Sequence, residues 1–453
     1  MYVAVTGRVA APAMASSTIA WARCSRPTPV FQRQSRREAT GSSTFIEQSS
    51  RIKRRLVPVS WVSCFLPSPP EGVHMSRLSR LIPLAALALL LIVPVAHAAK
   101  KPPIRLAIEA PITGPQASNG IDMLRGVQLA VRQVNAKGGV LGRKVVIVRG
   151  DDKGDSANAV AVAEDVIAEG PDAIVGPYNS SVGLLNLPLY RKARVVPIWL
   201  TSNTNTQGQG ITLQPMNSQV APQEAKFLLG KGYQKVTILV DTTANGAYTK
   251  GIATRLRRLL EDKGVTVNWV QIVETADAPP GYYAAKVAEA LATSPDVIYS
   301  STYFPEGVEI AKAIVADGTS TPCHMSLGNI DAGFVSGAGI PTSQRCTFTG
   351  VPEATKLSSA KRFVKDYRKA FKTDPGVWGV FTYDSANAYF RAVRRTHSTN
   401  YTKVLKELRK MKNVPGQTGK ITIDPKNGYR KTLPFLAVLR VNSAGDFVVN
   451  TGS

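Results

Sequence analysis

The chain has 453 residues, of which 56 are Lys or Arg and 31 are Asp or Glu, so its net charge at pH 7 is +25. The first hypothesis that such a charge suggests is nucleic-acid binding. The sequence, however, shows no compact basic stripe interleaved with aromatic residues and no groove-reading motif. We therefore expect no nucleic-acid partner. A cationic solvated surface explains the charge, with attraction to an anionic ligand or a membrane surface as the alternative.

Residues 1–74 precede the part of the chain that we expect to fold. They are rich in Arg, Ser and Pro, hold three acids and show no sustained helix or strand period. We interpret them as upstream sequence translated from a start placed too early. A disordered basic extension is the alternative, because this composition also suits disorder.

Residues 75–98 have the pattern of a cleavable signal peptide. Arg77 and Arg80 supply a cationic segment, residues 81–95 an apolar one, and residues 96–98 an Ala-His-Ala cleavage site. The apolar segment is shorter than a membrane-spanning helix and contains two prolines. The sequence therefore predicts export to the periplasm.

The 355 residues that follow the predicted cleavage site carry a net charge of about +16, because 12 Lys or Arg and three acids precede residue 99. Their length is sufficient for two domains, each with its own core. Only Cys323 and Cys346 follow the cleavage site. In an exported protein we expect one structural disulfide between them, and two free buried thiols are the alternative.

From residue 104 the sequence alternates short β-branched segments with longer segments of helical period. Strands are predicted at 104–109, 144–149, 172–176 and 195–200, and helices at 120–135, 156–169 and 182–192. After a polar stretch at 201–214 the alternation restarts, with helices at 222–231, 247–263 and 282–293 and strands at 235–240, 266–273 and 297–301. Strands separated by helices imply parallel sheets, so we expect an α/β fold with two Rossmann-like lobes.

In parallel sheets of this kind, ligands bind beyond the carboxyl ends of the strands. The corresponding loops are 111–120, 176–181, 201–205, 241–246 and 302–306. Several of their residues are small, uncharged and able to form hydrogen bonds: Ser180, Ser181, Thr201, Ser202, Asn203 and Asn245. These side chains suit a ligand that is bound and released without proton transfer.

The sequence offers little material for catalysis. Only His324 and His397 follow the cleavage site, and neither lies in a triad or zinc pattern. The acids at 151, 152 and 155 lack a further ligand pattern, so we interpret them as capping a helix that starts near Ser156. No phosphate-binding glycine motif and no G-x-S-x-G elbow occurs. We expect neither an enzyme nor a metal site nor a cofactor.

A set of motifs carries a family resemblance. The segment 134–142, Val-Asn-Ala-Lys-Gly-Gly-Val-Leu-Gly, is followed by Asp151-Asp152 and Ala159-Val160, and Pro-Ile-Thr-Gly-Pro occupies 111–115. In their order and spacing these motifs, with Gly-Gln-Thr-Gly at 416–419, resemble the leucine/isoleucine/valine-binding family of periplasmic substrate-binding proteins. The resemblance covers essentially all of residues 103–450.

The resemblance implies two lobes joined by a three-segment hinge, with crossovers near Ala221, Val351 and Leu433. It places residues 99–221 and 352–433 in lobe 1 and residues 222–351 and 434–453 in lobe 2. It further implies a monomer that captures a small ligand between the lobes and delivers it to a membrane-embedded ABC permease in trans.

The family's ligand-binding positions can be matched residue by residue. A serine that contacts the ligand carboxylate and ammonium matches Ser180, next to Ser181, and two further contacts match Thr201 and Asn203. On lobe 2 the aromatic residue used in closure matches Tyr303. Trp378 matches an aromatic wall position, with ordinary core packing as the alternative for both aromatic residues.

Two departures from the family pattern concern the ligand. Amino-acid binders carry an acid on lobe 2 that neutralises the ligand ammonium, but residues 327–331 have none at that place, and Asp331 replaces it only if the loop shifts. Two positions that are aromatic in amino-acid binders are Asn119 and Asn245 here. A carboxylate or amide ligand without a free ammonium is thus the rival to an amino acid, because an unpaired buried charge costs several kcal/mol.

The same bilobal module also suits a second function, a ligand sensor that acts in signalling. No kinase, DNA-binding or membrane-spanning segment is fused to it in the sequence, so a signalling partner would act in trans. Transport and sensing stay open as alternatives, as does the identity of the ligand.

Overall fold

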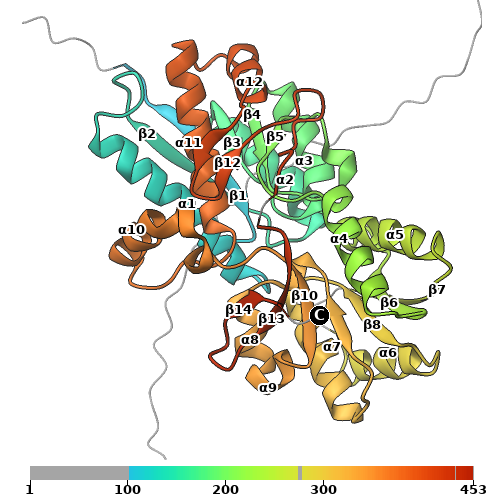
Figure 1. Ribbon diagram of the computed structural model, residues 1–453. Helices are drawn as coiled ribbons and strands as arrows, with labels where there is room; N and C mark the ends of the chain where they lie inside the picture. Colours follow the sequence, from blue (N-terminus) through green and yellow to red (C-terminus); the bar gives the residue numbers. More distant parts are fainter. Residues whose placement is uncertain (1–100, 274–277, 434, 452–453) are drawn as a thin grey trace, which may run out of the picture. The chain divides into compact units, whose positions relative to one another are not determined.

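The structure is a computed structural model that describes residues 101–273, 278–433 and 435–451. The predictions for residues 1–74 and for the signal peptide at 75–98 lie outside the described residues. The predicted α/β fold with two parallel-sheet lobes is confirmed. We call the five-stranded sheet with its helices lobe 1, and the seven-stranded sheet with its helices lobe 2 (Figure 1).

The sheet of lobe 1 has the strand order β2-β1-β3-β4-β5 and is parallel throughout. Its strands are β1 (Ile104–Ala110), β2 (Val145–Asp151), β3 (Ala173–Val175), β4 (Val196–Trp199) and β5 (Ile211–Thr212). β1, β3 and β4 are buried almost throughout. Apolar runs of this kind are typical of parallel strands covered on both faces.

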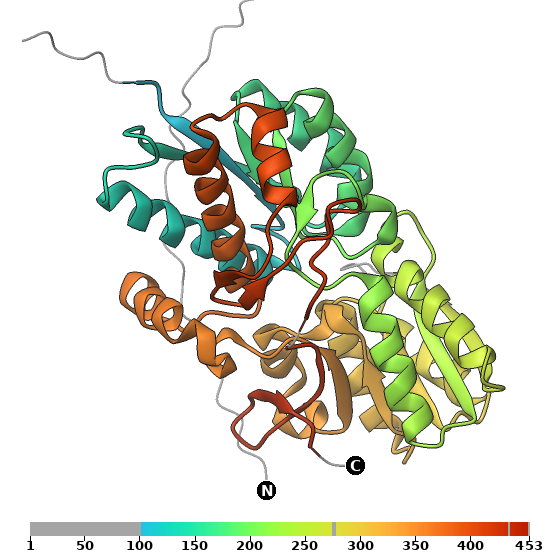
Figure 2. The same ribbon diagram turned by 45° about the horizontal axis from the view of Figure 1, so that its top comes forward.

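The sheet of lobe 2 has the order β14-β13-β10-β9-β8-β6-β7. Its strands are β6 (Lys235–Asp241), β7 (Thr266–Ile272), β8 (Val297–Ser301), β9 (Cys323–Met325), β10 (Cys346–Gly350), β13 (Ala437–Val441) and β14 (Phe447–Val449). The first five are mutually parallel. Strand β13 pairs antiparallel with β10, and β14 pairs antiparallel with β13, so these two strands extend the sheet at one edge (Figure 2). The sequence did not predict this antiparallel edge.

Helices flank both sheets. They are α1 (Ala117–Ala136), α2 (Ser156–Ala168), α3 (Ser180–Lys192), α4 (Asn217–Gly230), α5 (Ala247–Glu261), α6 (Tyr282–Leu291), α7 (Phe304–Asp317), α8 (Ala332–Ala338), α9 (Ile340–Ser343), α10 (Lys361–Phe371), α11 (Gly379–Thr396) and α12 (Tyr401–Arg409). Short 3-10 turns lie at Thr204–Thr206, Leu327–Asn329, Ala354–Lys356 and Ser358–Ala360. A small hairpin, β11 (Val414–Gly416) with β12 (Gly419–Ile421), completes the described elements.

The chain passes between the lobes three times: after β5, after β10 and after β12. Between the second and third passages it contributes α10 and α11, which pack against α1 of lobe 1 (Figure 1). The first boundary, which we placed after Ala221, falls within α4, a helix that packs against α5, β10 and β13 of lobe 2. The exact lobe boundaries stay predictions.

Two helices contain a proline in their interior. We predicted one helix from residue 222, but α4 begins at Asn217 and contains Pro222 in its interior. Similarly, α3 continues through Pro188. Tertiary packing therefore outweighs the loss of one backbone donor in each helix.

Two local motifs agree with the sequence. Gly138 and Gly139 end α1 with φ of +86° and +83°, and the N–H of Gly139 donates to the carbonyl of Val134 at 2.9 Å. Asp155 is the N-cap of α2, where its Oδ1 accepts from the N–H of Ala157 at 2.9 Å. The capping interpretation of Asp155 is thereby confirmed.

Neighbouring strands of lobe 2 hold the two cysteines and the buried histidine. Cys323 of β9 and Cys346 of β10 are in register and form a disulfide. His324 is fully buried, and its ring nitrogens contact the hydroxyls of Thr347 and Thr349 at 2.8 Å each. Burial lowers the pKa of His324 to about 3, so this side chain is a neutral core residue.

Among residues 101–273, 278–433 and 435–451, no helix has both the length and the apolar character that crossing a bilayer requires.

Candidate functional site

A small cavity of about 10 Å³ lies where residues of the two lobes meet. Lobe 1 and the segment that follows it contribute Tyr178, Ser180, Leu200, Ser202, Gln214 and Trp378, and lobe 2 contributes Tyr248, Tyr303, Leu327 and Gly328. Most of these residues follow the carboxyl ends of β3, β4, β6, β8 and β9. The cavity is therefore at the edge of the sheets where a ligand was expected.

Four aromatic side chains form much of the wall. The ring of Tyr178 lies 5.4 Å from that of Trp378 and 6.0 Å from that of Tyr303, measured between centroids. Tyr303 in turn lies 5.1 Å from Tyr248. Each ring is at most 8 % exposed, so these contacts form one aromatic cluster that spans both lobes.

Ser180 is the first residue of α3, and its side chain lines the cavity. Its Oγ accepts from the N–H of Asn203 at 3.2 Å, which joins the loop after β4 to the start of α3. The first N–H groups of a helix have no partner within the helix and attract negative charge. Ser180 and the amino end of α3 are thus suited to a carboxylate or another polar acceptor.

Ser202 and Gln214 supply the other polar groups of the wall. Ser202 Oγ donates to the carbonyl of Pro215 at 2.8 Å and accepts from Gln214 Nε2 at 3.2 Å, while Gln214 Nε2 also contacts the carbonyl of Leu200. Gln214 Oε1 is buried and accepts no hydrogen bond from the described residues. A ligand N–H or O–H would satisfy this acceptor.

The lining contains no Asp, Glu, Lys or Arg among the described residues. Burial, with the neighbouring Tyr248 and Asp331, raises the pKa of Tyr178 well above 10, so its hydroxyl stays protonated at neutral pH. The described lining is thus polar but uncharged.

Amino-acid binders carry an acid on lobe 2 that contacts the ligand, and Asp331 is the acid nearest to that place. Its carboxylate forms hydrogen bonds with other groups of the protein. Its Oδ1 accepts from the Oγ of Ser118 on lobe 1 at 2.8 Å and from the N–H of Gly333 at 2.6 Å, where it caps α8. Burial raises its pKa to about 6. Asp331 thus joins the lobes and is absent from the lining of the cavity.

Of the eight residues predicted to bind the ligand, the structure brings Ser180, Tyr303 and Trp378 together at the cavity. Thr201 lies behind the wall, where its Oγ1 donates to the hydroxyl of Thr206 at 2.7 Å. The side chain of Asn203 donates to the carbonyl of Ala247 on lobe 2 at 2.6 Å. These two residues order the loop after β4 and do not line the cavity.

The other three predicted residues also lie off the lining. Asn245 contacts the amino end of α2, where its Oδ1 accepts from the N–H and Oγ of Ser156 at 3.1 Å and 2.6 Å. Ser181 and Asn119 are buried, and neither Ser181 Oγ nor Asn119 Nδ2 has a partner among the described residues. The expectation that Asn119 and Asn245 make the pocket more polar therefore has no support in the lining.

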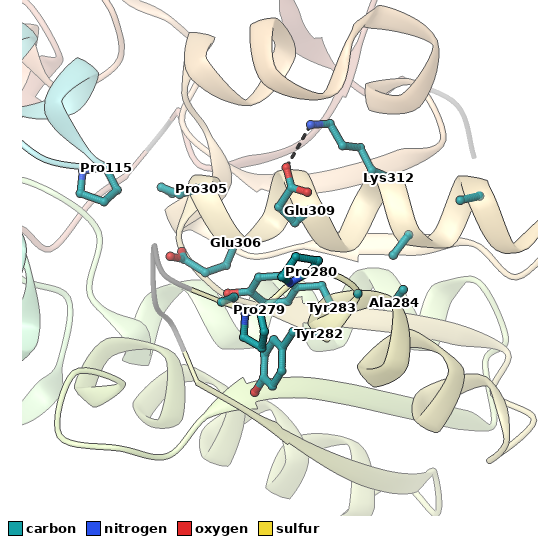
Figure 3. Close-up of a pocket in the computed structure, with 14 residues that line it drawn as sticks. Pro115, Pro279, Pro280, Tyr282, Tyr283, Ala284, Pro305, Glu306, Glu309 and Lys312 are labelled. Atoms are coloured by element: carbon teal, nitrogen blue, oxygen red, sulfur yellow. Dashed lines mark hydrogen bonds and ion pairs between the residues drawn. The ribbon is translucent and has the colours of Figure 1, made fainter.

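A larger groove of about 580 Å³ lies on lobe 2 (Figure 3). Its walls are the start of α6, with Tyr282 and Tyr283, and the exposed side of α7, where Lys312 and Glu309 pair at 3.0 Å. Pro115 is the sole contribution from lobe 1 among the described lining residues. We place the candidate site in the smaller cavity because residues of both lobes enclose it.

Six lining residues were not singled out from the sequence as ligand contacts: Tyr178, Leu200, Gln214, Tyr248, Leu327 and Gly328. Tyr178 lies inside the loop 176–181 that was expected to face the ligand, and Tyr248 follows the loop 241–246. An aromatic residue within or just after such a loop was a usable signal. Gln214 and Gly328 follow short elements that the sequence did not define.

Known proteins resemble this chain over nearly all of its described length. A family model described as periplasmic binding protein matches residues 103–446. The Leu/Ile/Val-binding protein BraC3 of Rhizobium johnstonii is 27% identical over 346 residues, which cover 73% of this chain and 88% of that protein. The Leu/Ile/Val/Thr-binding protein of Salmonella typhimurium is 27% identical over 63% of this chain and 78% of its own length.

Solved structures share the fold. The leucine binding protein LivK of Thermotoga maritima has a TM-score of 0.69 at 23% identity. The match covers 77% of this chain and 99% of that chain. A solute binding protein of an ABC transporter from Rhodopseudomonas palustris, in complex with 3,4-dihydroxy benzoic acid, has a TM-score of 0.65 at 18% identity, with 76% of this chain and 94% of that chain covered. At these identities the similarity concerns the fold alone.

Proposed function

This chain belongs to the periplasmic binding protein family, and we propose that it captures a small solute between its two lobes and delivers it to an ABC importer. The relatives in Rhizobium johnstonii and Salmonella typhimurium are described as binding Leu, Ile and Val, the latter also Thr, which supports a small polar solute as ligand. In this proposal no covalent bond of the ligand changes.

The observation that carries the proposal is the uncharged cavity with walls from both lobes. A ligand in it would contact Ser180 on one lobe and Tyr303 on the other, so binding would favour the state in which the lobes lie together. The inter-lobe hydrogen bonds of Asp331 and Asn245 would then stabilise the same state.

The wall chemistry narrows the ligand class. Helix α3 offers N–H groups beside Ser180 for a carboxylate, and Gln214 Oε1 offers an acceptor for a ligand O–H or N–H. A free ammonium group of the ligand would lose its hydration in the cavity, and the described lining has no carboxylate to pair with it. Burying an unpaired charge in this way is costly in free energy. We therefore propose a carboxylate or amide with an apolar or aromatic body and a neutral donor, rather than an unmodified amino acid.

The ligand of the Rhodopseudomonas palustris protein, 3,4-dihydroxy benzoic acid, has these features. It carries one carboxylate, hydroxyl donors and a flat ring, and it has no ammonium. We propose accordingly that aromatic acids belong to the first compounds to test, alongside the amino acids bound by the relatives.

The cellular part of the proposal follows the family. The mature chain would begin near Ala99, act in the periplasm as a monomer, and meet a membrane permease in trans. Lobe 1 would comprise residues 99–221 and 352–433, and lobe 2 residues 222–351 and 434–453.

A thermal-shift screen tests the ligand class with matched pairs. Leucine is compared with 4-methylpentanoate and leucinamide, and benzoate with hydroxybenzoates and benzamide. At a hundredfold excess over its Kd a true ligand adds about 2.7 kcal/mol to the unfolding free energy. We expect the compounds that lack an ammonium to stabilise the protein, followed by calorimetric titration of the strongest.

Stabilisation by leucine with none by its deaminated analogue would contradict the proposed ligand class while leaving the binding function intact. Turnover of any stabilising compound would contradict the binding function itself. A deletion strain separates transport from the sensor alternative, because loss of uptake indicates transport and intact uptake with lost induction indicates sensing.

A further inference from the structure

The positive charge of the chain is concentrated at one end of lobe 1. Residues 391–412, which include the carboxyl end of α11 and all of α12, hold eight Lys or Arg and a single acid, Glu407. Seven of the eight basic residues are exposed, and Arg409 is half-buried. This concentration contrasts with the dispersed charge that we inferred from the sequence as a whole.

The fold adds a second segment to this region. Arg194, which follows α3, places its guanidinium 4.7 Å from the ring centre of Tyr401 and donates to the hydroxyl of Thr402 at 2.8 Å. Arg191 and Lys192 at the end of α3 are exposed. We call residues 191–194 and 391–412 together the cationic face. Figure 1 shows α12 beside α11 and next to β4.

The charge of this face is little compensated. Its acid, Glu407, pairs with Arg395, so it neutralises a cation of α11. Within the described residues, no acid forms an ion pair with Lys403, Lys406 or Lys410. Like charges this close repel one another and are stabilised by an anionic partner.

The same helix borders an apolar groove of about 380 Å³. Tyr401, Leu405 and Pro425 supply its apolar part, and Lys406, Arg409 and Lys410 line it as well. An amphipathic surface with aromatic and aliphatic residues beside several cations suits a partner that presents anionic groups next to hydrocarbon.

We propose that the cationic face docks on an anionic phospholipid bilayer. The inference rests on the proposed function, which places the protein in the periplasm and its permease in a membrane. Each Lys or Arg near an anionic bilayer contributes favourably and over a short range. A nucleic acid fits less well, because Tyr401 is the single aromatic residue among the described lining residues of the groove and a row of aromatic residues for base stacking is lacking there.

Docking would concentrate the loaded protein at the surface where its permease lies. The ligand cavity is built from other residues of the chain, none of which belongs to the cationic face. Loss of docking should therefore leave the affinity for the solute unchanged.

Vesicle co-sedimentation tests the proposal with the purified exported protein. Vesicles of phosphatidylcholine alone are compared with vesicles that also contain phosphatidylglycerol, at low and at high salt. The variant Lys403→Gln/Lys406→Gln/Lys410→Gln removes three exposed cations. The control variant Lys226→Gln/Lys250→Gln/Lys263→Gln removes three exposed cations from lobe 2 and has the same net charge.

We expect salt-sensitive binding to phosphatidylglycerol vesicles only, an affinity at least about tenfold lower in the α12 variant, and little change in the control. No sedimentation with anionic vesicles overturns the proposal, as does an equal loss in the control variant. So does α12-dependent binding to a polyanion such as DNA without vesicle binding.

Thermal shifts with the solute keep the two proposals apart. If the protein binds the solute normally but does not bind anionic vesicles, the proposed docking on the bilayer is refuted and the proposed function is not. Vesicle binding by a protein that no solute stabilises refutes the proposed function alone.

Discussion

The contact between Asn245 and the amino end of α2 offers a direct test of lobe closure. Asn245 lies between β6 and α5 of lobe 2, and its Oδ1 accepts from the N–H and the Oγ of Ser156 on lobe 1. Its Nδ2 donates to Asp155 Oδ1 at 3.3 Å. Because the partners belong to different lobes, Asn245→Ala should weaken the state in which the lobes lie together.

The magnitude follows from these bonds. One hydrogen bond is worth about 0.5–1.5 kcal/mol net, and the bond between Ser156 Oγ and Asn245 Oδ1 is the shortest of the three at 2.6 Å. Loss of the whole contact should cost about 1–3 kcal/mol, which raises the apparent Kd roughly 5- to 150-fold. Since Asn245 does not line the cavity, the factor should be the same for every ligand.

Calorimetric titration of Asn245→Ala, Ser156→Ala and the double variant with two chemically different ligands measures this effect. The two substitutions should be non-additive by about 0.5 kcal/mol or more, because they remove one shared contact. Asn268→Ala is the control, since Asn268 contacts Thr237 within lobe 2. A change in the preference between the two ligands, or strictly additive effects, would refute the closure role and return Asn245 to the ligand.

Three further predictions concern the site and the stability of lobe 2. Ser180→Ala, and separately Tyr303→Ala, should each weaken solute binding by about 1–3 kcal/mol in calorimetry with an unchanged circular dichroism spectrum, and unchanged affinity in both would remove the cavity as the site. Burial raises the pKa of Glu224 to about 8 from an ordinary 4.5, so the folded state keeps a proton that the unfolded chain releases, and the unfolding free energy should fall between about pH 5 and 8. In urea unfolding, the decrease in unfolding free energy over this pH range should be smaller in Glu224→Gln by up to about 5 kcal/mol. The same pH dependence of the unfolding free energy in both proteins would contradict the raised pKa of Glu224. Cys323→Ser/Cys346→Ser should lower the unfolding free energy by about 3 kcal/mol, and reductant should then have no further effect on the variant.

Sequence periodicity indicates where a ligand site should lie more directly than it indicates which side chains line that site. Strand and helix periods identified parallel sheets, and such sheets bring the loops after their strands to one edge. Ser180 was found in this way, because it follows a predicted strand and its short loop, whereas Tyr303 was matched through the family resemblance. The prediction of the loops themselves needs only local periodicity and one general rule of topology.

The errors concern contacts between distant segments. Asn245 lies in an expected loop, yet its partner Ser156 is 89 positions away on the other lobe. Local sequence states that a side chain is polar and near an edge, but not whether it faces the solute or the opposite lobe. Strand β13 was missed for the same reason, since its pairing with β10 joins residues some 90 positions apart, such as Thr347 and Arg440, and β14 is attached to the sheet only through β13.

The role of Asp331 connects the neutral cavity with closure. In an amino-acid binder an acid of lobe 2 would meet the ligand ammonium, but here the carboxylate of Asp331 accepts from Ser118 and thereby joins the lobes directly. One oxygen of this carboxylate already accepts from Ser118 and Gly333, and Asp331 is not part of the described lining where an ammonium would lie. A ligand without positive charge leaves both bonds intact, so binding and closure reinforce each other. The position of Asp331 therefore has two consequences. The described lining of the cavity has no acid, and the contact between the lobes has one.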